Sequence, residues 1–219
     1  MWKRSRDKIN HILENDSEYL NKNVTVYGWL LTIRKQGKNS LAFAKLNDGS
    51  SQKSLQLIFS DKYTKQLETF LKNAGTGVSI KASGIIKPSP AQQQSIELQV
   101  ITCSVLGSVE TKTYPISKKR HGMEHLRKHE HLRIRTNVFR AVTKIRNTCA
   151  FSTHQFFQQL GFHYIHTPIL TSNDCEGAGE TFTITSQYPL NEKPVKIKKK
   201  KEFFGKPVNL TVSGQLHGE

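Results

Sequence analysis

Acidic residues are scarce in this 219-residue chain. It has 17 aspartates and glutamates against 33 lysines and arginines, which gives a formal net charge of +16 and a pI of about 9.8. A balance this basic favours an anionic partner, and nucleic acid is the first candidate. A generally basic protein without such a partner is the alternative that charge alone leaves open.

Cysteine is also rare, since Cys103, Cys149 and Cys175 are the three in the chain. Their odd number and wide spacing argue against a disulfide framework and indicate a reducing compartment. The sequence has no Cys-x-x-Cys pair, no apolar run of membrane-spanning length and no apolar signal core near its start. We therefore expect a cytoplasmic protein with no membrane span.

Short alternating runs separated by turns fill the first half of the chain. An amphipathic helix is expected at Arg6–Leu20 and a second helix at Lys62–Asn73. Five strands are expected around the second helix: Val24–Leu30, Ser40–Leu46, Ser54–Phe59, Val78–Ile86 and Ser95–Val105. Five short strands with a helix between the third and fourth are typical of an OB-fold barrel, which often binds single-stranded nucleic acid.

Four side chains in the strand region are candidates for a nucleic-acid groove: Arg34, Lys35, Phe43 and Gln56. Aromatic rings stack on bases in OB-folds, and basic side chains attract phosphate. Phe43 could equally fill the barrel core, and Gln56 could be an ordinary exposed strand residue. The pattern leaves both interpretations open.

A basic, histidine-rich linker and a long helix follow the strands. His121, His125, His129 and His131 raise the hypothesis of a zinc site, but no cysteine or third ligand joins them at a useful spacing, so no metal is expected. Apolar residues at helical spacing predict a helix over Asn137–Leu160, which Gly161 would end. A strand is expected at Phe162–His166.

Two glycine-containing polar loops occupy the last part of the chain, at Ser172–Glu180 and at Thr211–Glu219. Glycine lets the backbone approach a ligand closely, and acidic and amide side chains supply directed acceptors. A pocket for a small zwitterion such as an amino acid is one interpretation. Two ordinary surface turns are the other.

The amino-acid sequences of these loops resemble those of a known family. The runs Thr167-Pro-Ile-Leu-Thr-Ser-Asn-Asp-Cys-Glu-Gly-Ala-Gly-Glu180, Phe203-Phe-Gly-Lys-Pro207 and Leu210-Thr-Val-Ser-Gly-Gln-Leu216 closely resemble the asparaginyl-tRNA synthetases, which are class II aminoacyl-tRNA synthetases. The resemblance runs from about Val24 to the last residue. It implies an OB-fold barrel followed by the incomplete start of an α+β class II catalytic domain, an antiparallel sheet with helices.

The resemblance also implies a domain organisation. Residues 1–108 would be the N-terminal helix and the OB-fold anticodon-binding domain, 109–135 a hinge, and 136–219 the first part of the catalytic domain. The long helix, glycine, strand and Pro168 look like motif 1 of the class, which builds the homodimer interface. Motifs 2 and 3, whose arginines hold ATP, are not found, so we expect these 219 residues alone to be inactive.

The family's binding residues fall on named positions of this sequence. In the barrel, the resemblance places Phe43 and Gln56 at the tRNA anticodon, with Phe43 stacked on the central uridine and Gln56 bonded to its edge. Arg34, a candidate for the same groove, is the third residue expected at the anticodon. The amino-acid-binding residues it implies are Glu176, Ser213, Gln215 and Glu219. A carboxylate suits the substrate α-ammonium, and Glu219 would select an asparagine amide over an aspartate.

The implied reaction is the ATP-dependent attachment of asparagine to tRNA-Asn, an activity of asparagine–tRNA ligases. ATP with Mg²⁺ would be a substrate of the full-length enzyme, and none of these groups is expected to be held by the present residues as a resident cofactor. A non-catalytic tRNA-binding OB-fold protein is the alternative function. An aspartyl enzyme of relaxed specificity is less favoured, because the aspartyl relatives have a lysine where this chain has Gly218.

Overall fold

The computed structural model describes residues 6–91, 94–110, 112–116, 119–173, 181–184 and 204–218. The chain divides into two compact units, Met1–Thr148 and Cys149–Glu219. The finer boundaries expected at residues 108 and 135 stay predictions.

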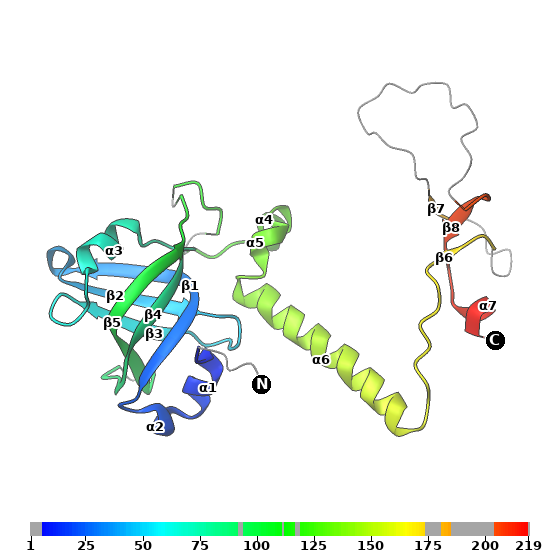
Figure 1. The fold of residues 1–219 in the computed structure, drawn as a ribbon. Coiled ribbons are helices and arrows are strands. Elements are labelled where there is room, and N and C mark those ends of the chain that lie inside the picture. The colour runs from blue at the N-terminus through cyan, green and yellow to red at the C-terminus, as the bar shows by residue number, and fades with distance from the viewer. Residues whose placement is uncertain are drawn as a thin grey trace, which may run out of the picture. The chain divides into compact units, whose positions relative to one another are not determined.

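The first unit is built on a closed five-stranded barrel (Figure 1). Its strands are β1 Asn23–Gln36, β2 Leu41–Asn47, β3 Leu55–Ser60, β4 Ser79–Pro88 and β5 Ile96–Gly107. They pair in the order β1-β2-β3-β5-β4, and β1 returns to β4 to close the barrel. All pairings are antiparallel except that of β3 with β5. The barrel predicted from the sequence is therefore confirmed.

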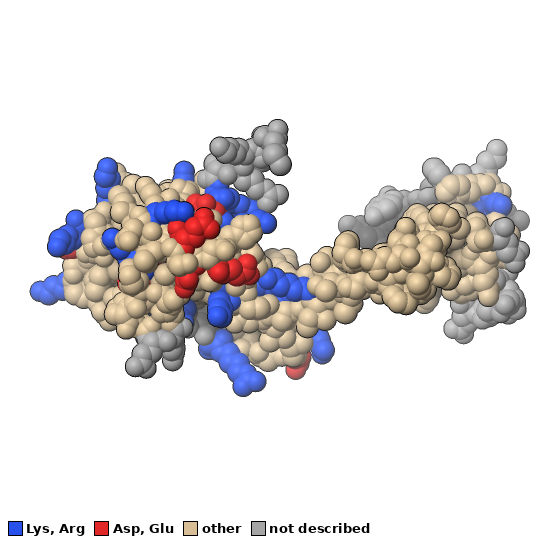
Figure 2. Space-filling model, turned by 90° about the horizontal axis from the view of Figure 1, so that it is seen from below, with Lys and Arg blue, Asp and Glu red and all other residues tan. Residues whose placement is uncertain are grey.

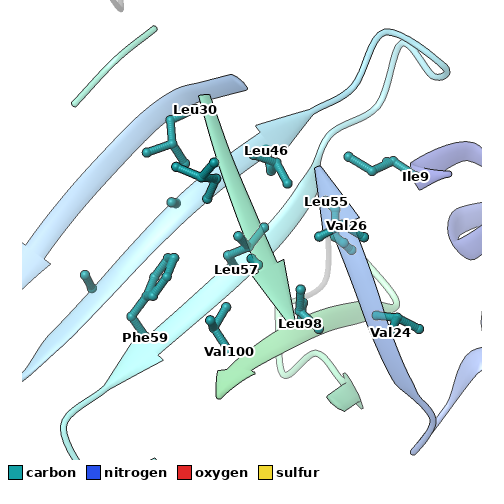
Figure 3. Packing of buried hydrophobic residues seen from close by; sticks show 14 of the residues in the cluster. Ile9, Val24, Val26, Leu30, Leu46, Leu55, Leu57, Phe59, Leu98 and Val100 are labelled. Atoms are coloured by element: carbon teal, nitrogen blue, oxygen red, sulfur yellow. The ribbon is translucent and has the colours of Figure 1, made fainter. Parts of the chain in front are cut away.

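Alternate residues of the strands fill the barrel, because successive side chains of a strand point to opposite faces. Figure 3 shows Leu57, Phe59 and Leu98 in this interior, and all three are fully buried. Ile9 of the N-terminal helix is also fully buried in the same cluster. The core is thus a single contiguous cluster that joins all five strands and the first helix.

A β-bulge in β1 changes which residues face outward. The pairing of β1 with β2 shifts between Leu30 and Thr32. Leu30 fills the core, and after the bulge it is the odd-numbered Ile33 that packs against the core. An extra residue in a strand reverses its alternation. As a result Thr32 and Arg34 lie on the outer face of the barrel.

The N-terminal segment folds as two short helices, α1 Ile9–Glu14 and α2 Asp16–Tyr19, so the single helix expected at Arg6–Leu20 is wrong. Asn15 lies between them with φ −123° and ψ 43°. Its side-chain Nδ2 donates to the His11 carbonyl oxygen at 2.9 Å. Such a local bond competes with helix continuation. A short 3₁₀ turn, Gly37–Asn39, joins β1 to β2.

Helix α3, Leu67–Asn73, lies between β3 and β4 in the sequence and buries Leu67, Phe70 and Leu71. The helix expected at Lys62–Asn73 is confirmed in its end and its apolar face, but it begins five residues later, because Gln66 has a left-handed backbone with φ +56°. Phe70 stacks on Phe59 of the barrel, with ring centroids 4.9 Å apart. Aromatic stacking of this kind adds to the area that the pair buries.

Helices α4 Met123–Lys128 and α5 Glu130–Arg133 follow the barrel, and the long helix α6 spans Asn137–Gln159. The predicted helix Asn137–Leu160 is confirmed to within one residue. Gly161 has a φ of +85° after its end, which suits a glycine helix stop.

The second unit contains a small sheet of β6 Leu170–Thr171, β8 Val208–Leu210 and β7 Thr183–Ile184, in that order, and a short helix α7 at Gln215–Gly218. The strand expected at Phe162–His166 is wrong, because that segment is extended but unpaired. Its residues are exposed, and a strand needs a partner for its backbone donors and acceptors. Across the part of the chain that is described, no helix is long and apolar enough to cross a bilayer.

We predict that Leu57→Ala lowers the free energy of unfolding of the chain by about 2–5 kcal/mol, because it leaves a cavity inside the closed barrel. Leu57 is 0% exposed. Leu106→Ala is the matched control, since Leu106 is also on a barrel strand but is 57% exposed. Its cost should stay below about 1 kcal/mol. Urea denaturation followed by tryptophan fluorescence measures both, and equal losses would contradict the assigned core.

Candidate nucleic-acid interface

The outer face of β1, β2 and β3 presents side chains in cross-strand rows. Arg34 of β1 pairs with Phe43 of β2, and Lys45 of β2 pairs with Gln56 of β3. Directly opposed residues of antiparallel strands have their side chains on the same face, about 5 Å apart at Cβ. The three predicted anticodon-binding residues therefore meet on one surface, although 22 positions separate the first from the last in the numbering.

A groove of about 400 Å³ runs over these rows. Its lining residues are Thr32, Arg34, Gln36, Phe43, Ala44, Lys45 and Gln56. The lining contains one aromatic ring, two amides and two cations, and none of these residues is acidic. An aromatic ring for stacking, amides that can hydrogen-bond to base edges and basic side chains together suit single-stranded nucleic acid.

Phe43 lies outside the barrel, which excludes its alternative role in the core. Its neighbours Ala42 and Ala44 are buried at 0% and 2% exposure, so alternation turns the ring of Phe43 outward. The residue is half-buried in the wall of the groove. A ring held in this way offers a π-face on which a base can stack.

Gln56 is held by an acidic neighbour. Its amide Nε2 donates to Oε2 of Glu97 on β5 at 3.4 Å, and the same oxygen accepts from Ser89 Oγ at 3.1 Å. The bond uses one of the two N–H donors of the amide, and the other N–H and the carbonyl oxygen remain for a ligand. Sequence reasoning missed Glu97, because it lies 41 residues from Gln56 and only barrel closure brings them together.

Charge alone does not locate this interface. Figure 2 shows lysines and arginines spread over the face in view, with most of the visible aspartates and glutamates in one group. A net charge of +16 gives a long-range attraction for anions that falls with salt. The position of the interface follows instead from the groove and its aromatic ring.

Two of the predicted amino-acid-binding residues also lie together. Ser213 Oγ donates to Oε1 of Gln215 at 3.3 Å, and the Gln215 backbone N–H donates back to Ser213 Oγ at 3.3 Å. These two polar side chains precede and begin α7 in the second unit. Glu176 and Glu219 lie outside the described residues. Pro168 is described, and it is an exposed residue of the extended segment before β6.

The linker histidines form a stack. The rings of His121 and His125 are 4.7 Å apart with an interplanar angle of 13°, and His125 and His129 are 4.6 Å apart. Near-parallel stacked rings do not aim their nitrogens at a common ion. His125 Nε2 lies 3.0 Å from the Pro115 carbonyl oxygen. In the described ranges no set of three or more His, Cys, Asp or Glu is arranged to hold a metal.

Comparison with known protein families identifies two consecutive matches. Residues 24–106 match the OB-fold nucleic acid binding domain, and residues 122–219 match the tRNA synthetases class II (D, K and N). The first match covers the barrel strands and the groove. The second covers α4 to α7 and the loops that contain Ser213 and Gln215.

Curated relatives and solved structures agree with these matches. The chain is 48% identical over 217 residues to an asparagine–tRNA ligase of Treponema denticola, covering 93% of this chain and 45% of that protein. It is 45% identical over 213 residues to that of Borrelia garinii subsp. bavariensis, covering 96% and 45%. The chain thus spans about 45% of the length of these relatives.

Among solved structures, asparaginyl-tRNA synthetase from Pyrococcus horikoshii complexed with asparaginyl-adenylate matches with a TM-score of 0.76 and 22% identity, over 98% of this chain and 44% of that one. The Entamoeba histolytica asparaginyl-tRNA synthetase matches with a TM-score of 0.69 and 21% identity, over 90% and 41%. At these identities the likeness establishes the fold.

We predict that the NMR titration midpoint of His129 lies below 6.5. Desolvation lowers the pKa of this ring from its ordinary value of 6.5, and repulsion from His125, His131 and His121 lowers it further. Because the folded state disfavours the protonated ring, the stability contributed by this group falls as the pH drops below 6.5.

The variant His125→Gln should raise the midpoint of His129, since it removes one repelling charge. His11→Gln is the control and should leave the midpoint unchanged, because His11 is not among the groups that act on His129. A midpoint at or above 6.5 in the unaltered protein would contradict the stacked arrangement.

Proposed function

Because the chain belongs to the class II tRNA synthetases of the aspartyl, lysyl and asparaginyl group, we propose that the protein is an asparagine–tRNA ligase. Its reaction activates asparagine with ATP to asparaginyl-AMP and pyrophosphate, and then transfers the acyl group to the terminal ribose of tRNA-Asn. The strongest support is the identity of 45–48% to asparagine–tRNA ligases over nearly the whole chain.

The barrel groove would bind the anticodon. Phe43 stacks on the central uridine, which supplies about 1–3 kcal/mol whatever the base. Gln56 supplies selectivity, since its amide can both donate to and accept from a base edge. The bond from Gln56 to Glu97 supports this role, because it restrains the amide before RNA arrives. Arg34, an exposed residue of the groove lining, would meet a phosphate.

The two polar loops of the second unit would bind asparagine. Glu176 accepts hydrogen bonds from the α-ammonium of the substrate, and Ser213 and Gln215 orient it. The mutual hydrogen bonds of Ser213 and Gln215 support this proposal, because they fix two acceptors side by side. Glu219 selects the asparagine NH₂ and repels aspartate. ATP with Mg²⁺ is a substrate in this proposal, bound by the whole enzyme.

Helix α6 and Pro168 would form the homodimer interface. Six large apolar side chains of α6 are more than 40% exposed: Val138, Val142, Ile145, Phe151, Phe156 and Phe157. Apolar surface of this extent marks a site that another surface covers. The cytoplasmic location inferred from the cysteines stays a prediction.

A non-catalytic RNA-binding protein is the second candidate. The observation that favours it is that all seven groove residues belong to the first unit, so RNA binding needs nothing from the second. The two candidates make the same prediction for the groove and opposite predictions for asparagine activation.

We predict that Phe43→Ala weakens binding of tRNA-Asn about 5- to 150-fold, because the stacking energy is lost. Phe43→Tyr should retain most of the affinity, since it keeps the ring. Gln56→Ala should reduce the preference for a central uridine, whereas Gln52→Ala in the exposed turn after β2 is the matched control. Fluorescence anisotropy across a salt series measures all four variants.

Equal and steeply salt-sensitive binding of tRNA-Asn and a tRNA with another central base would reject the anticodon assignment. In that result the affinity comes from the net charge of +16 alone.

We predict that the protein containing this sequence catalyses exchange of pyrophosphate into ATP with asparagine and not with aspartate. Gln215→Ala should raise the KM for asparagine about tenfold, because a hydrogen bond to a charged group is lost. Glu219→Gln should reduce the ratio of the exchange rate with asparagine to that with aspartate. Exchange driven equally by aspartate would contradict the proposed selectivity, and no exchange at all would favour the non-catalytic alternative.

A further inference from the structure

A second hollow lies on the first unit, on a different surface from the anticodon groove. Its volume is about 420 Å³. Its walls come from β1, from the turn after β2, and from α5 and the first turns of α6. The lining residues are Trp29, Leu31, Asn47, Gly49, His131, Ile134, Arg135, Arg140, Thr143 and Lys144. It shares none of these residues with the groove.

The charge of this hollow is of one sign. Arg135, Arg140 and Lys144 are cationic, His131 can become so, and none of the ten lining residues is acidic. The remainder of the wall is largely apolar, with an indole ring and two branched aliphatic side chains. A ligand that fits must therefore combine an anionic group with a flat or apolar group.

Arg140 is the least expected of these cations, because its side chain is 6% exposed. Its Nη1 donates to the Ser51 carbonyl oxygen at 3.1 Å and its Nη2 to the Arg135 carbonyl oxygen at 2.9 Å. Within the described ranges no carboxylate lies within 4.0 Å of its guanidinium. Buried charges are ordinarily paired, so this positive charge is incompletely compensated.

The acidic residue that acts on Arg140, Asp48, does not neutralise its charge. Burial lowers the pKa of Arg140, and the charge of Asp48 raises it by a smaller effect. The carboxylate of Asp48 already accepts from the Ile9 backbone N–H at 3.1 Å and from the Ser50 backbone N–H at 2.9 Å. An anionic ligand in the hollow would supply the compensation that the protein lacks.

The flat wall is an arginine stacked on a tryptophan. The Arg135 guanidinium lies 5.0 Å from the centroid of the Trp29 ring, and its Nη1 donates to the Tyr114 hydroxyl at 3.3 Å. Trp29 remains 37% exposed. Fixed guanidinium planes and aromatic rings are the surfaces on which proteins stack unpaired nucleobases.

We infer that this hollow binds one nucleoside monophosphate unit, with the base against Trp29 and Arg135 and the phosphate at Arg140 and Lys144. Lys144 is exposed, and its Nζ is held by the Ser50 carbonyl oxygen at 2.6 Å, so it is already positioned beside the opening. The unit can be an unpaired nucleotide of RNA or a free mononucleotide. This inference does not depend on the anticodon groove.

Trp29 is a direct reporter for the test, because the sequence has one other tryptophan, Trp2. In a Trp2→Phe background, the full 219-residue chain is titrated with AMP, with adenosine and with inorganic phosphate, and the fluorescence of Trp29 is followed. We expect saturable quenching by AMP at concentrations at which adenosine and phosphate have little effect. Lys144→Gln should weaken AMP binding about tenfold, as expected for loss of a charge-assisted contact.

Lys38→Gln is the matched control, because Lys38 is an exposed lysine in the turn between β1 and β2 and does not line the hollow. Far-UV circular dichroism and thermal unfolding check that each variant is folded. Phe43→Ala should leave the AMP titration unchanged, which separates this site from the anticodon groove.

A parallel titration with tRNA distinguishes the two sources of the nucleotide. If Lys144→Gln weakens both AMP and tRNA binding, the hollow takes a nucleotide of RNA. If it weakens AMP binding alone, the ligand is a free mononucleotide. Quenching by phosphate equal to that by AMP, or an AMP titration that Lys144→Gln does not alter, would overturn the inference.

Discussion

Closure of the barrel is the constraint on which the candidate interface depends. A closed sheet has no edge, so every strand must give alternate side chains to the interior and the others to the surface. Ala42, Ala44, Leu57 and Phe59 face inward. Phe43, between two of these, has no other place than the outer face. The stacking ring is therefore positioned by the packing of its neighbours, which are small enough to leave room in the barrel.

The turn after β2 connects the barrel to the flanking helices α1 and α6 through hydrogen bonds. The Asp48 carboxylate accepts from the N-terminal N–H of α1, the Ser50 carbonyl accepts from Lys144, and the Ser51 carbonyl accepts from Arg140. Buried Asn47 holds the turn itself, since its Nδ2 donates to the carbonyl oxygens of Ser51 and Lys53. This turn joins β2, which contains Phe43, to β3, which contains Gln56, so two strands of the groove are connected by the turn that Arg140 and Lys144 of α6 bind. The groove and the hollow lined by Trp29 and Arg140 are thus parts of one hydrogen-bonded framework within the first unit.

The sequence was sufficient for features that depend on local pattern. The alternation of apolar residues predicts the five strands, and apolar residues at helical spacing predict α3 and α6. The family resemblance identifies Phe43 and Gln56 as candidates. The sequence was not sufficient where one residue alters the pattern. The bulge after Leu30 turns Arg34 outward, and no residue type at that position predicts a bulge. Asn15 divides a helix by a side-chain bond, and the Phe162–His166 segment has β-prone residues but no pairing partner. Glu97 needs barrel closure to reach Gln56, so no short-range signal could have identified it.

The groove and the hollow differ in their local charge, which the overall composition of the chain does not reveal. Glu97 places a carboxylate beside the groove over β1, β2 and β3, where it accepts an N–H of Gln56 and would repel a phosphate group. The hollow lined by Trp29 and Arg140 has no acidic lining residue and contains a buried guanidinium without a carboxylate partner in the described part of the chain, a setting that suits an anionic group. Both lie on a chain of net charge +16, which attracts anions at long range without orienting them. Orientation requires one place where a base is preferred and another where phosphate is preferred. The carboxylate of Glu97 beside the groove, and the lack of an acidic lining residue in the hollow, give the two sites this difference in their preference for phosphate.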